Sequence, residues 1–438
     1  MVMEVVEVFH KELQVGAVSY DVENRVGVFE YAPEFIKTGI QLSPLKMPLA
    51  KGLYRFANLD YDTFKGLPGL LADSLPDDFG NSILNAWVAS EGRSVSDITP
   101  LQRLSYTGQR GMGALTYKPT KVKALRGVEN IQIDALVKVA QDVLESRNNF
   151  EADVGPVGEE NKEAMLQLMS VGMSAGGARP KAVVAFNGDF TQARSGQTDA
   201  PEGFNHYLMK FDGVSEHNKN KETFGDPIGF GAGEYVYYLM ATRCGIDMSY
   251  STLLNEGSRR HFITQRFDRV GNERVHVQTL NGLAHVSFKK AGSYSYEELI
   301  GIARQLRLSS SDALQLFKRM VFNVVARNHD DHSKNTSFMH NEHNQWVLAP
   351  AYDLAYSYRP GSPWVNSHWM TVNGKREDFE RNDFYAFEKL SPIFSRKRIN
   401  EILDETIEHV SRWQELAKDN DVPKTLIDEV RSNLRLHL

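Results

Sequence analysis

Hydrophobic and polar residues alternate over short stretches in the first 120 residues, a pattern that predicts β-strands joined by turns. The chain start reads as a first strand, and further strand patterns cover Glu7–Val18, which resembles a hairpin, and Arg25–Tyr31. Between Leu70 and Trp87 the apolar spacing becomes helical after the start signal Pro76-Asp-Asp. Tyr106–Tyr117 then supplies a glycine-rich turn into a strand. We therefore expect residues 1–120 to form a small α+β domain.

The remaining sequence places strand patterns before helical ones. Helices are predicted at Ile133–Ser146, Glu160–Leu168 and near Gly233–Thr242, and strands at Lys181–Phe186, His206–Phe211 and His261–Phe267. From Tyr296 onward the chain is mainly helical, with helices predicted at Ser311–Arg327, Lys397–Lys418 and Pro423–Leu438. This order suggests two lobes around a cleft. We expect three domains, over residues 1–120, 121–270 and 271–438.

Composition narrows the class of protein. The 438 residues are 41% hydrophobic and 24% charged, the ordinary balance of a globular protein. No run of 18 apolar residues occurs and the N-terminus is acidic, so we expect neither a membrane span nor a secretory signal. A net charge of −6 without a Lys/Arg block argues against strong autonomous binding to nucleic acid. Cys244 stands alone, which excludes an intramolecular disulfide, favours a cytoplasmic location and fits a buried structural thiol better than a nucleophile.

The densest polar segment is Arg327-Asn-His-Asp-Asp-His-Ser-Lys-Asn-Thr-Ser, directly after an apolar helix. Asp330 and Asn335 are five positions apart, the interval that separates the base and the magnesium-binding Asn in a protein-kinase catalytic loop. Lys334 can neutralise phosphate charge, and the Asn335 amide oxygen suits Mg²⁺. This segment therefore predicts a phosphoryl-transfer centre with Asp330 as the base, because Asp331 lacks the required spacing.

A kinase also needs a carboxylate on the metal, beyond a following strand. Trp346-Val-Leu-Ala-Pro-Ala-Tyr-Asp predicts a short strand and then Asp353. The separation of Asn335 from Asp353 leaves room for a β-hairpin that brings the two together. Asn335 and Asp353 are thus the predicted metal ligands.

Two other interpretations of this segment stand beside the kinase. An Asp-Asp-His run is often a solvated loop or a helix N-cap. His329, Asp330, Asp331 and His332 could instead ligate a transition metal in a hydrolase, although four consecutive residues rarely converge on one ion.

Upstream residues supply candidates for phosphate binding. Lys210 ends an apolar strand, where a lone charge needs a partner, and Glu234 at the start of the next helix is the natural candidate. A strand-end lysine that reaches water is the alternative. Ser174-Ala-Gly-Gly-Ala-Arg-Pro-Lys181 is a glycine-rich loop whose amides could approach phosphate, although it matches neither common phosphate-loop pattern and a tight turn explains it equally well.

These motifs, in this order, resemble the HipA family of bacterial serine/threonine kinases, the toxin halves of toxin–antitoxin pairs. The resemblance covers nearly the whole chain. In the first domain it rests on Tyr31-Ala-Pro-Glu-Phe, Leu42-Ser-Pro-Leu, Met47-Pro-Leu, Leu75-Pro-Asp-Asp and Gly111-Met-Gly-Ala-Leu. Later it rests on Ser174-Ala-Gly-Gly-Ala-Arg-Pro-Lys, Lys210, Gln265-Arg-Phe-Asp-Arg, Asp330-x-His-x-Lys-Asn335 and Ala351-Tyr-Asp-Leu. It implies an α+β, two-lobed protein-kinase-like fold with an N-terminal α+β subdomain and a mainly helical C-terminal lobe.

The resemblance also implies roles for individual residues. Asp330 becomes the catalytic base, and Asn335 and Asp353 ligate Mg²⁺. Ser174 becomes an autophosphorylation site whose phosphate, with a charge of about −2, inactivates the enzyme. The implied ATP-contacting positions are Ser174, Ala175, Gly176, Gly177, Ala178, Arg179, Lys181, Lys210, Glu234, Gln265, Arg266, Phe267, His332 and Lys334.

Two positions depart from the family pattern. The hinge strand usually begins with Glu where this chain has Gln265, so a charged contact with adenine is lost while backbone contacts survive. The phosphate loop carries Arg179-Pro180 where the best-known members carry Gln-Glu, which puts its autophosphorylation switch in question.

The implied partners follow from the toxin–antitoxin assignment. A helix-turn-helix, HipB-like antitoxin dimer should bind the chain and carry it to operator DNA. The implied substrate is a protein, with aminoacyl-tRNA synthetases as the family precedent, so blocked translation and growth arrest would follow. The alternative is a catalytically weak kinase-like scaffold that represses transcription together with the antitoxin.

Overall fold

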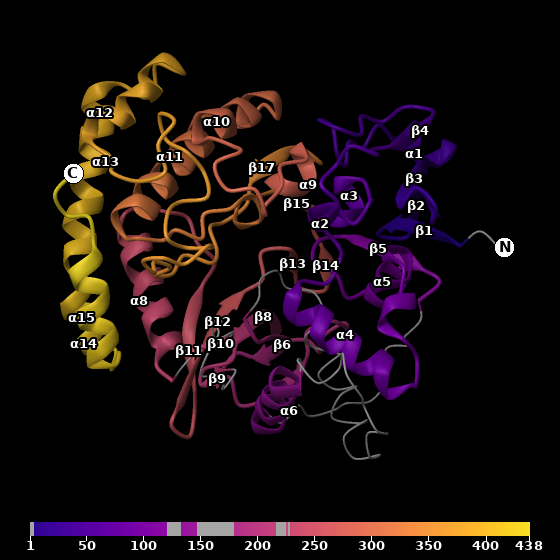
Figure 1. Ribbon diagram of the computed structural model, residues 1–438, viewed down its shortest axis with the longest axis horizontal. Helices are drawn as coiled ribbons and strands as arrows, with labels where there is room; N and C mark the ends of the chain where they lie inside the picture. The colour runs from indigo at the N-terminus through magenta and orange to yellow at the C-terminus, as the bar shows by residue number, and fades with distance from the viewer. Residues whose placement is uncertain (1–3, 121–132, 147–178, 216–224, 227) are drawn as a thin grey trace. The chain divides into compact units, whose positions relative to one another are not determined.

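The computed structural model describes residues 4–120, 133–146, 179–215, 225–226 and 228–438 (Figure 1). Contacts divide the chain into two compact units. The first unit comprises Met1–Leu42, Leu49–Gly231 and Ser251–His276, and the second Ser43–Pro48, Ala232–Tyr250 and Val277–Leu438. The predicted domain boundaries at residues 120 and 270 stay predictions.

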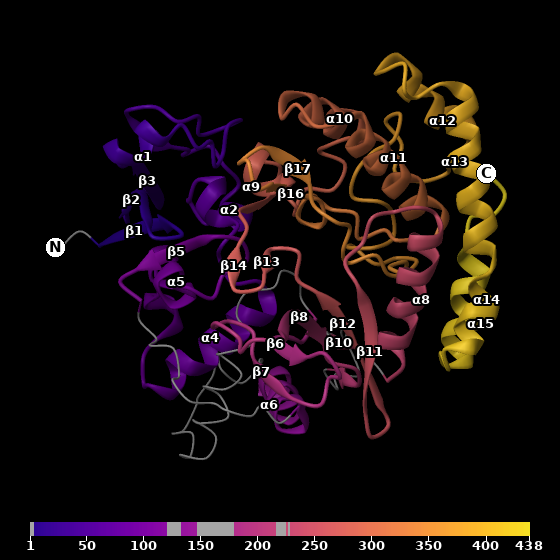
Figure 2. The ribbon, with the colours of Figure 1, turned by 180° about the vertical axis from the view of Figure 1, so that it is seen from behind.

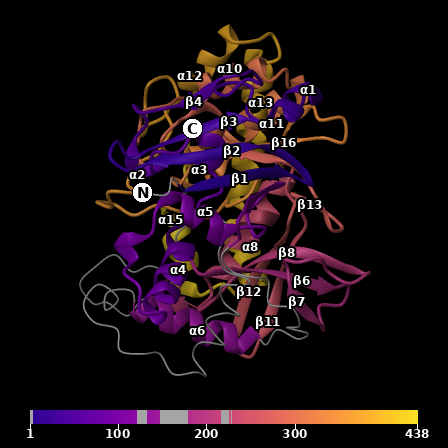
Figure 3. The same ribbon diagram turned by 90° about the vertical axis from the view of Figure 1, so that its right-hand side faces the viewer.

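A five-stranded antiparallel sheet forms the N-terminal part of the first unit, with β1, β2 and β3 side by side (Figure 3). Its order β4-β3-β2-β1-β5 is built from β1 (Val5–His10), β2 (Leu13–Asp21), β3 (Val26–Tyr31), β4 (Leu53–Arg55) and β5 (Leu115–Lys118). In β1, Val6 and Val8 are buried while Val5 is exposed, because successive side chains of a strand face opposite sides. The predicted hairpin and the strand over Arg25–Tyr31 are confirmed.

Short helices accompany this sheet. They are α1 (Pro33–Thr38), α2 (Tyr61–Phe64), α3 (Gly69–Ala72), α4 (Asp78–Ser90), the 3₁₀ turn η1 (Val95–Asp97) and α5 (Pro100–Thr107). The predicted start signal is confirmed, because the Asp77 side chain accepts a hydrogen bond from the Gly80 N–H and caps α4. Helix α5 was not predicted from the sequence. It begins after the N-cap residue Thr99, and its first helical residue is a proline.

A second antiparallel sheet, of order β11-β12-β8-β6-β7, completes the first unit. Its strands are β6 (Lys181–Asn187), β7 (Ala193–Ser195), β8 (Phe204–Lys210), β11 (Ser251–Glu256) and β12 (Arg259–Gln265). Val184, Met209 and Ile263 join one hydrophobic core with the apolar stripe of α6 (Ile133–Ser146) and residues of α4. The three predicted strands and the helix over Ile133–Ser146 are confirmed, whereas β7 and β11 were missed. Two-residue pairings add β9 (Val214–Ser215) to β10 (Gly225–Asp226) and β13 (Arg269–Val270) to β14 (Glu273–Arg274).

A buried ion cluster in the first unit joins the glycine-rich turn before β5 to the segment after β12. The carboxylate of Asp268 accepts hydrogen bonds from Arg266, from Arg269 and from the Gly113 N–H, at 2.6 to 2.8 Å. We call Asp268 with Arg266 and Arg269 the Asp268 cluster. Burial alone would raise the pKa of Asp268, but the two guanidinium groups hold it far below its ordinary value. The cluster therefore connects the two sheets of this unit through charged hydrogen bonds.

The second unit is mainly helical. Its helices are α8 (Phe230–Arg243), which begins in the first unit, α9 (Leu280–Ala284), α10 (Tyr296–Gln305), α11 (Ser310–Val325), α12 (Arg381–Phe384), α13 (Arg396–Ser411), α14 (Trp413–Asp419) and α15 (Lys424–Asn433), with 3₁₀ turns η2 (Ser333–Asn335) and η3 (Tyr385–Lys389). A small antiparallel sheet contains β15 (Val277–Thr279), β16 (Ser337–His340) and β17 (Trp346–Leu348). Figure 2 shows α14 and α15 side by side next to α8, where the Tyr237 and Trp413 rings meet at 5.5 Å.

The predicted C-terminal helices differ from the observed ones in extent. The helix predicted over Lys397–Lys418 is two helices, because the chain turns at Arg412 to bury Trp413, whose Nε1–H donates to the Ile427 carbonyl. The helix predicted to end at Leu438 ends at Asn433, and the Arg435 N–H then donates to the Val325 carbonyl. The helix predicted at Glu160–Leu168 lies outside the described residues.

Candidate active site

The polar segment predicted to carry the chemistry follows directly from α11. Arg327 has a φ of 57°, which ends the helical path. The His329 N–H donates to the Ser357 carbonyl and the Ser357 N–H donates to the Arg327 carbonyl, both at 3.1 Å. These bonds pair Asn328 with Ser357 in a short parallel bridge. The loop is therefore fixed through its backbone on a buried helix, an arrangement that suits catalytic residues.

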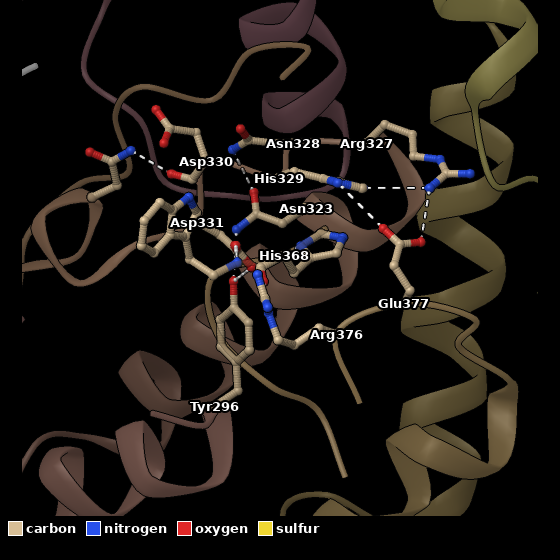
Figure 4. Close-up of polar contacts among 12 residues, drawn as sticks. Tyr296, Asn323, Arg327, Asn328, His329, Asp330, Asp331, His368, Arg376 and Glu377 are labelled. Carbon is tan, nitrogen blue, oxygen red and sulfur yellow. Dashed lines mark hydrogen bonds and ion pairs between the residues drawn. The ribbon is translucent and has the colours of Figure 1, made fainter. Parts of the chain in front are cut away.

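The two adjacent carboxylates of this loop lie in opposite environments. The Asp330 side chain is 41% exposed, and His332 Nε2 lies 3.6 Å from its Oδ1. The Asp331 side chain is fully buried and accepts from Tyr296 Oη, His368 Nδ1 and the Trp369 N–H, at 2.7 to 2.8 Å (Figure 4). Asp330 can thus meet an incoming group, whereas Asp331 is occupied by internal hydrogen bonds.

Asn335 is joined to Asp330 within one turn of chain. Its Nδ2 donates to the Asp330 carbonyl at 2.7 Å, and its backbone N–H donates to the His332 carbonyl at 2.9 Å. Because the amide nitrogen is directed at that carbonyl, the Oδ1 atom is the one that can ligate a cation. Mg²⁺ prefers oxygen ligands of this kind.

Asp353 follows the hairpin that the sequence predicted. Strands β16 and β17 pair antiparallel, and Asp353 lies beyond them with a φ of 57°. Its neighbour Tyr352 donates from Oη to the Lys334 carbonyl at 2.6 Å, so the segment before Asp353 is bonded to the residue before Asn335. The predicted hairpin is confirmed, while the role of Asp353 as a metal ligand stays a prediction.

The loop Asn328–Asn335 also contacts an aromatic side chain. The rings of Phe288 and His332 lie 5.6 Å apart, and Lys334 Nζ lies 4.5 Å from the Phe288 ring centroid. A cation over an aromatic face is held by the ring quadrupole. Phe288 therefore restricts where the Lys334 charge can lie.

Two of the lysines predicted to bind phosphate, Lys181 and Lys210, are in the first unit. Lys181 and Lys210 are opposite each other on β6 and β8, and both are almost fully buried. Lys181 Nζ lies 3.5 Å from the carboxylate of Asp77, the residue that caps α4. Glu234 is also buried, on α8 in the second unit. The pairing of Lys210 with Glu234 stays a prediction.

The predicted hinge and phosphate loop are described only in part. Gln265 ends β12, and the Arg266 N–H donates to the His206 carbonyl at 2.9 Å, so the strand pairing continues past Gln265. The Arg266 side chain belongs to the Asp268 cluster, while Phe267 is half-buried. Ser174, Ala175, Gly176, Gly177 and Ala178 lie outside the described residues, and Arg179 is the first described residue after them.

Two protein-family models match the chain. A model described as the HipA N-terminal domain matches residues 6–118, and one described as the HipA-like C-terminal domain matches residues 173–414. The second alone spans more than half of the 438 residues. The chain belongs to the HipA family.

Relatives of this HipA family member include proteins named as kinases. The Sinorhizobium fredii protein "Putative kinase Y4mE" is 24% identical over 210 residues, which cover 44% of this chain and 48% of the relative. A Haemophilus influenzae protein named "Putative kinase" is 22% identical over 224 residues, which cover 44% of this chain and 65% of the relative. The chain thus spans less than two thirds of each of these relatives.

A solved HipA structure shares the fold. The structure described as the Shewanella oneidensis toxin–antitoxin system HipA, HipB and its operator DNA complex superposes with a TM-score of 0.65. The match covers 98% of this chain and 95% of that one, at 16% sequence identity. The predicted fold class, α+β and kinase-like in the HipA manner, is confirmed.

The transition-metal interpretation of residues 329–332 and the structural role of Cys244 can be compared with the described residues. Among the described residues, no group of three or more His, Cys, Asp or Glu could hold a metal ion. His329 is directed at Glu377 and Asp331 at His368, so the four consecutive residues do not converge on a transition metal as a hydrolase would need. Cys244 is buried, and burial raises the pKa of its thiol to about 12, as expected for a structural thiol. No helix in the part of the chain that the structure describes is long and apolar enough to span a bilayer.

Several residues around the loop Asn328–Asn335 were not predicted from the sequence. Tyr352 stood in a quoted motif, but only its hydrogen bond to the Lys334 carbonyl reveals a role. Tyr296, His368 and Arg435 are remote in sequence from Asp331, and no local pattern pointed to them. The residue type and position of Asp331, beside the proposed base, were the one available signal.

Proposed function

We propose that this chain is an ATP- and Mg²⁺-dependent serine/threonine-protein kinase and the toxin component of a toxin–antitoxin module. The observation that carries the proposal is the arrangement of Asp330 and Asn335. The Asp330 carboxylate is exposed, and the backbone carbonyl of Asp330 accepts a hydrogen bond from the side-chain amide of Asn335. Membership in the HipA family and relatives named as kinases support it.

Residues of the second unit have separate proposed roles in orienting the substrate, binding the metal and offsetting phosphate charge. Asp330 accepts a hydrogen bond from a serine or threonine hydroxyl and orients it for in-line attack. The side-chain oxygens of Asn335 and Asp353 hold Mg²⁺, a hard cation that prefers neutral and anionic oxygen ligands. Lys334, placed over Phe288, offsets phosphate charge. Bound ATP with Mg²⁺ supplies the transferable phosphoryl group.

The remaining proposed contacts come from residues of the first unit and from Glu234 of the second. Lys210 neutralises the phosphates of ATP, and Glu234 balances its charge. Gln265 and the backbone through Phe267 contact adenine. The glycine-rich loop from Ser174 to Lys181 covers the phosphates.

Phosphate transfer from labelled ATP tests the proposal. Asp330→Asn should lower transfer by about 10²- to 10⁴-fold, because it removes the base while the exposed side chain leaves the fold unaffected. Glu342→Gln, at an 85% exposed carboxylate beyond β16, is the matched control and should keep native activity. Equal labelling by the native protein and Asp330→Asn would remove Asp330 from its proposed role.

A catalytically weak scaffold, acting as a co-repressor with an antitoxin, is the alternative. Thermal unfolding with and without Mg²⁺ and ATP separates it from the kinase. A ligand bound only by the native state at a hundred times its Kd stabilises by about 2.7 kcal/mol, so the kinase should show a clear rise in Tm. The measurement is made on the Ser174→Ala variant, which excludes a phosphorylated loop. No rise in its Tm at millimolar ATP would favour the scaffold.

Autophosphorylation at Ser174 is a separate part of the proposal. A phosphoserine there would add a charge of about −2 next to bound triphosphate and inactivate the enzyme. Phosphopeptide mapping after incubation with ATP should find phosphate at Ser174 and none in Asp330→Asn. An unmodified Ser174 in active protein contradicts the switch.

The proposed partners are a HipB-like helix-turn-helix antitoxin dimer and, through it, operator DNA. The Shewanella oneidensis structure is described as HipA with HipB and its operator DNA, and the net charge of −6 agrees with DNA contacts residing mainly in the antitoxin. The proposed substrate is a protein, and the family precedent for it is an aminoacyl-tRNA synthetase. Co-expression with a HipB-like helix-turn-helix antitoxin should yield a stable complex that retards operator DNA, and the chain alone should not retard it.

A further inference from the structure

A tryptophan lies on the surface of the second unit, outside the proposed catalytic and nucleotide-binding residues. The Trp364 side chain is 53% exposed, whereas Trp369, on which its ring stacks, is buried. The two ring planes are 19° apart and their centroids 6.1 Å apart, so Trp364 covers Trp369 while much of its own ring stays open to solvent. Isolated exposed apolar residues are common on protein surfaces, so the significance of Trp364 depends on what its ring is joined to.

Trp364 is the outer member of a series of rings that ends at the proposed base. The Trp369 ring meets the His332 ring edge to face at 6.1 Å, and His332 Nε2 lies 3.6 Å from Asp330 Oδ1. We call Trp364, Trp369 and His332 the ring series. Trp369 is fixed in place, because its N–H donates to the buried Asp331 carboxylate at 2.7 Å. The exposed tryptophan is therefore held at a defined distance from the proposed base.

The turn that carries Trp364 is closed by hydrogen bonds of its own. The Arg359 N–H donates to the Val365 carbonyl at 3.3 Å, and the Gly361 N–H donates to Asn366 Oδ1 at 2.8 Å. A side chain on a closed turn loses less conformational freedom on binding than one on an open loop. Trp364 is thus presented to solvent in an arrangement that binding does not have to create.

The length of the ring series limits which part of a substrate could contact Trp364. Each of its two ring-to-ring steps is 6.1 Å, and the last step to Asp330 is shorter. An extended peptide advances about 3.3 Å per residue. When the accepting hydroxyl lies at Asp330, a side chain at most about five positions away along the peptide can therefore reach Trp364.

The charges around Trp364 indicate which kind of side chain it can take. Residues 354–376 include no Asp or Glu, whereas Arg359 is exposed and its backbone is bonded to Val365, the residue after Trp364. A tryptophan face binds apolar groups or cations. A cation would meet the like charge of Arg359 and no carboxylate from this segment. The segment therefore favours an uncharged, apolar side chain.

We propose that Trp364 is a specificity-determining residue that binds an apolar side chain of the protein substrate, within about five positions of the accepting serine or threonine. This role rests on the proposed kinase function and adds to it the class of sequence that the kinase selects. Tryptophan is enriched among the residues that dominate binding at protein interfaces, because a large rigid surface is covered at little entropic cost.

Initial rates of phosphate transfer from ATP to synthetic peptides test the proposal on the full chain. Each peptide has a central serine in a glycine–alanine background and carries one leucine, which is moved stepwise along both sides of the serine. Leucine at one or two neighbouring positions should raise kcat/KM by about 10- to 50-fold over the peptide without leucine, because one apolar side chain is buried. Lysine at the same positions should give no such rise.

Variants of the exposed ring should change this preference. Trp364→Ala should bring peptides with and without leucine to within about threefold of each other, mainly through a higher KM for the leucine peptide, because the contact is equally strong before and during transfer. Trp364→Phe should keep part of the preference because it keeps an aromatic face. Leu53→Ala, at a side chain of β4 that is 68% exposed, is the matched control and should keep the native preference.

The ratio of rates separates recognition from a purely structural role. If Trp364 only packs on Trp369, Trp364→Ala lowers transfer to all peptides equally and the leucine preference stays, which overturns the inference. A native preference for lysine, or for no position, overturns it as well. Loss of affinity for a HipB-like antitoxin in Trp364→Ala, with the leucine preference intact, would assign the ring to that partner instead.

Failure of the inference and failure of the kinase proposal give different results. A native chain that Mg²⁺ and ATP stabilise against thermal unfolding, but that labels none of the peptides, overturns the role of Trp364 alone. A native chain that shows neither stabilisation nor labelling overturns the proposed kinase function.

Discussion

Asp268 in the first unit and Asp331 in the second both have fully buried side chains, and the two are held by different kinds of donor. Asp268 in the first unit is gripped by the guanidinium groups of Arg266 and Arg269, together with the Gly113 N–H. Asp331 in the second unit is held by the Tyr296 hydroxyl, the His368 imidazole and the Trp369 N–H. The first arrangement balances charge and joins two sheets, whereas the second orients a neighbouring reactive group. Burial of a carboxylate therefore does not by itself reveal its function, whereas the chemical type of its hydrogen-bond donors does.

The largest expected effect on stability comes from neutralising Asp268. Asp268→Asn leaves two buried guanidinium groups facing an amide, so the free energy of unfolding should fall by about 3–5 kcal/mol. Urea unfolding followed by circular dichroism measures this loss. Phosphate transfer per folded molecule should stay within about threefold of native, because Asp268 contacts the side chain of Arg266 and not the backbone through which this segment is proposed to contact adenine. A loss below about 1 kcal/mol would show that the arginines find other partners.

Asp331→Asn should show the reverse pattern. The three donors to Asp331 include no guanidinium group, so the stability loss should be only about 1–3 kcal/mol. The rate should nevertheless fall by about 100-fold, because the asparagine amide faces a donor and Asp330 is released. Chemical denaturation and kcat on the same preparation measure both quantities. A native kcat in a folded Asp331→Asn variant would show that Asp331 does not orient Asp330.

Acid should act on the first aspartate with a definite sign. The pKa of Asp268 is lower in the folded than in the unfolded chain, so its contribution is complete above the unfolded value of about 3.9 and is lost as pH falls toward the folded value. The stability difference between native protein and Asp268→Asn should therefore be constant from about pH 7 to 5 and shrink below about pH 4. Urea unfolding at a series of pH values measures it. A difference that grows on acidification contradicts the assignment.

The smallest effect is expected for Tyr296→Phe. It removes one neutral hydrogen bond to Asp331 and should cost about 1 kcal/mol of stability. An equal loss in the transition state corresponds to roughly fivefold in kcat. Tyr294→Phe, two residues earlier, is the control and should leave kcat unchanged. An identical decrease in the two variants would mean that the loss is not specific to Asp331.

Local patterns predicted the parts of this molecule that are set locally. The helix over Ile133–Ser146 and the hairpin before Asp353 follow from apolar spacing and turn residues within a few positions. The interval between Asp330 and Asn335 is also local, since one turn of chain joins them. These features could be predicted because the residues that determine them are neighbours in sequence.

Features that depend on distant partners could not be predicted. The break at Arg412 arises because Trp413 is buried against α8 and bonded to Ile427, which spacing within the helix does not encode. Asp331 and His368 are 37 positions apart, and nothing near either residue indicates the other. The difference between the two adjacent aspartates was predicted from spacing alone, and its physical basis, exposure of one and burial of the other, became visible only in the fold.

Rates of phosphate transfer by Asp330→Asn and Asp268→Asn, measured side by side and normalised to folded protein, distinguish a catalytic aspartate from a structural one. We expect Asp330→Asn to be as stable as the native chain but to lose about 10²- to 10⁴-fold in phosphate transfer from ATP in the presence of Mg²⁺. We expect Asp268→Asn to be much less stable but to transfer phosphate at nearly the native rate per folded molecule. Native transfer by a folded Asp330→Asn protein would contradict the role proposed for Asp330.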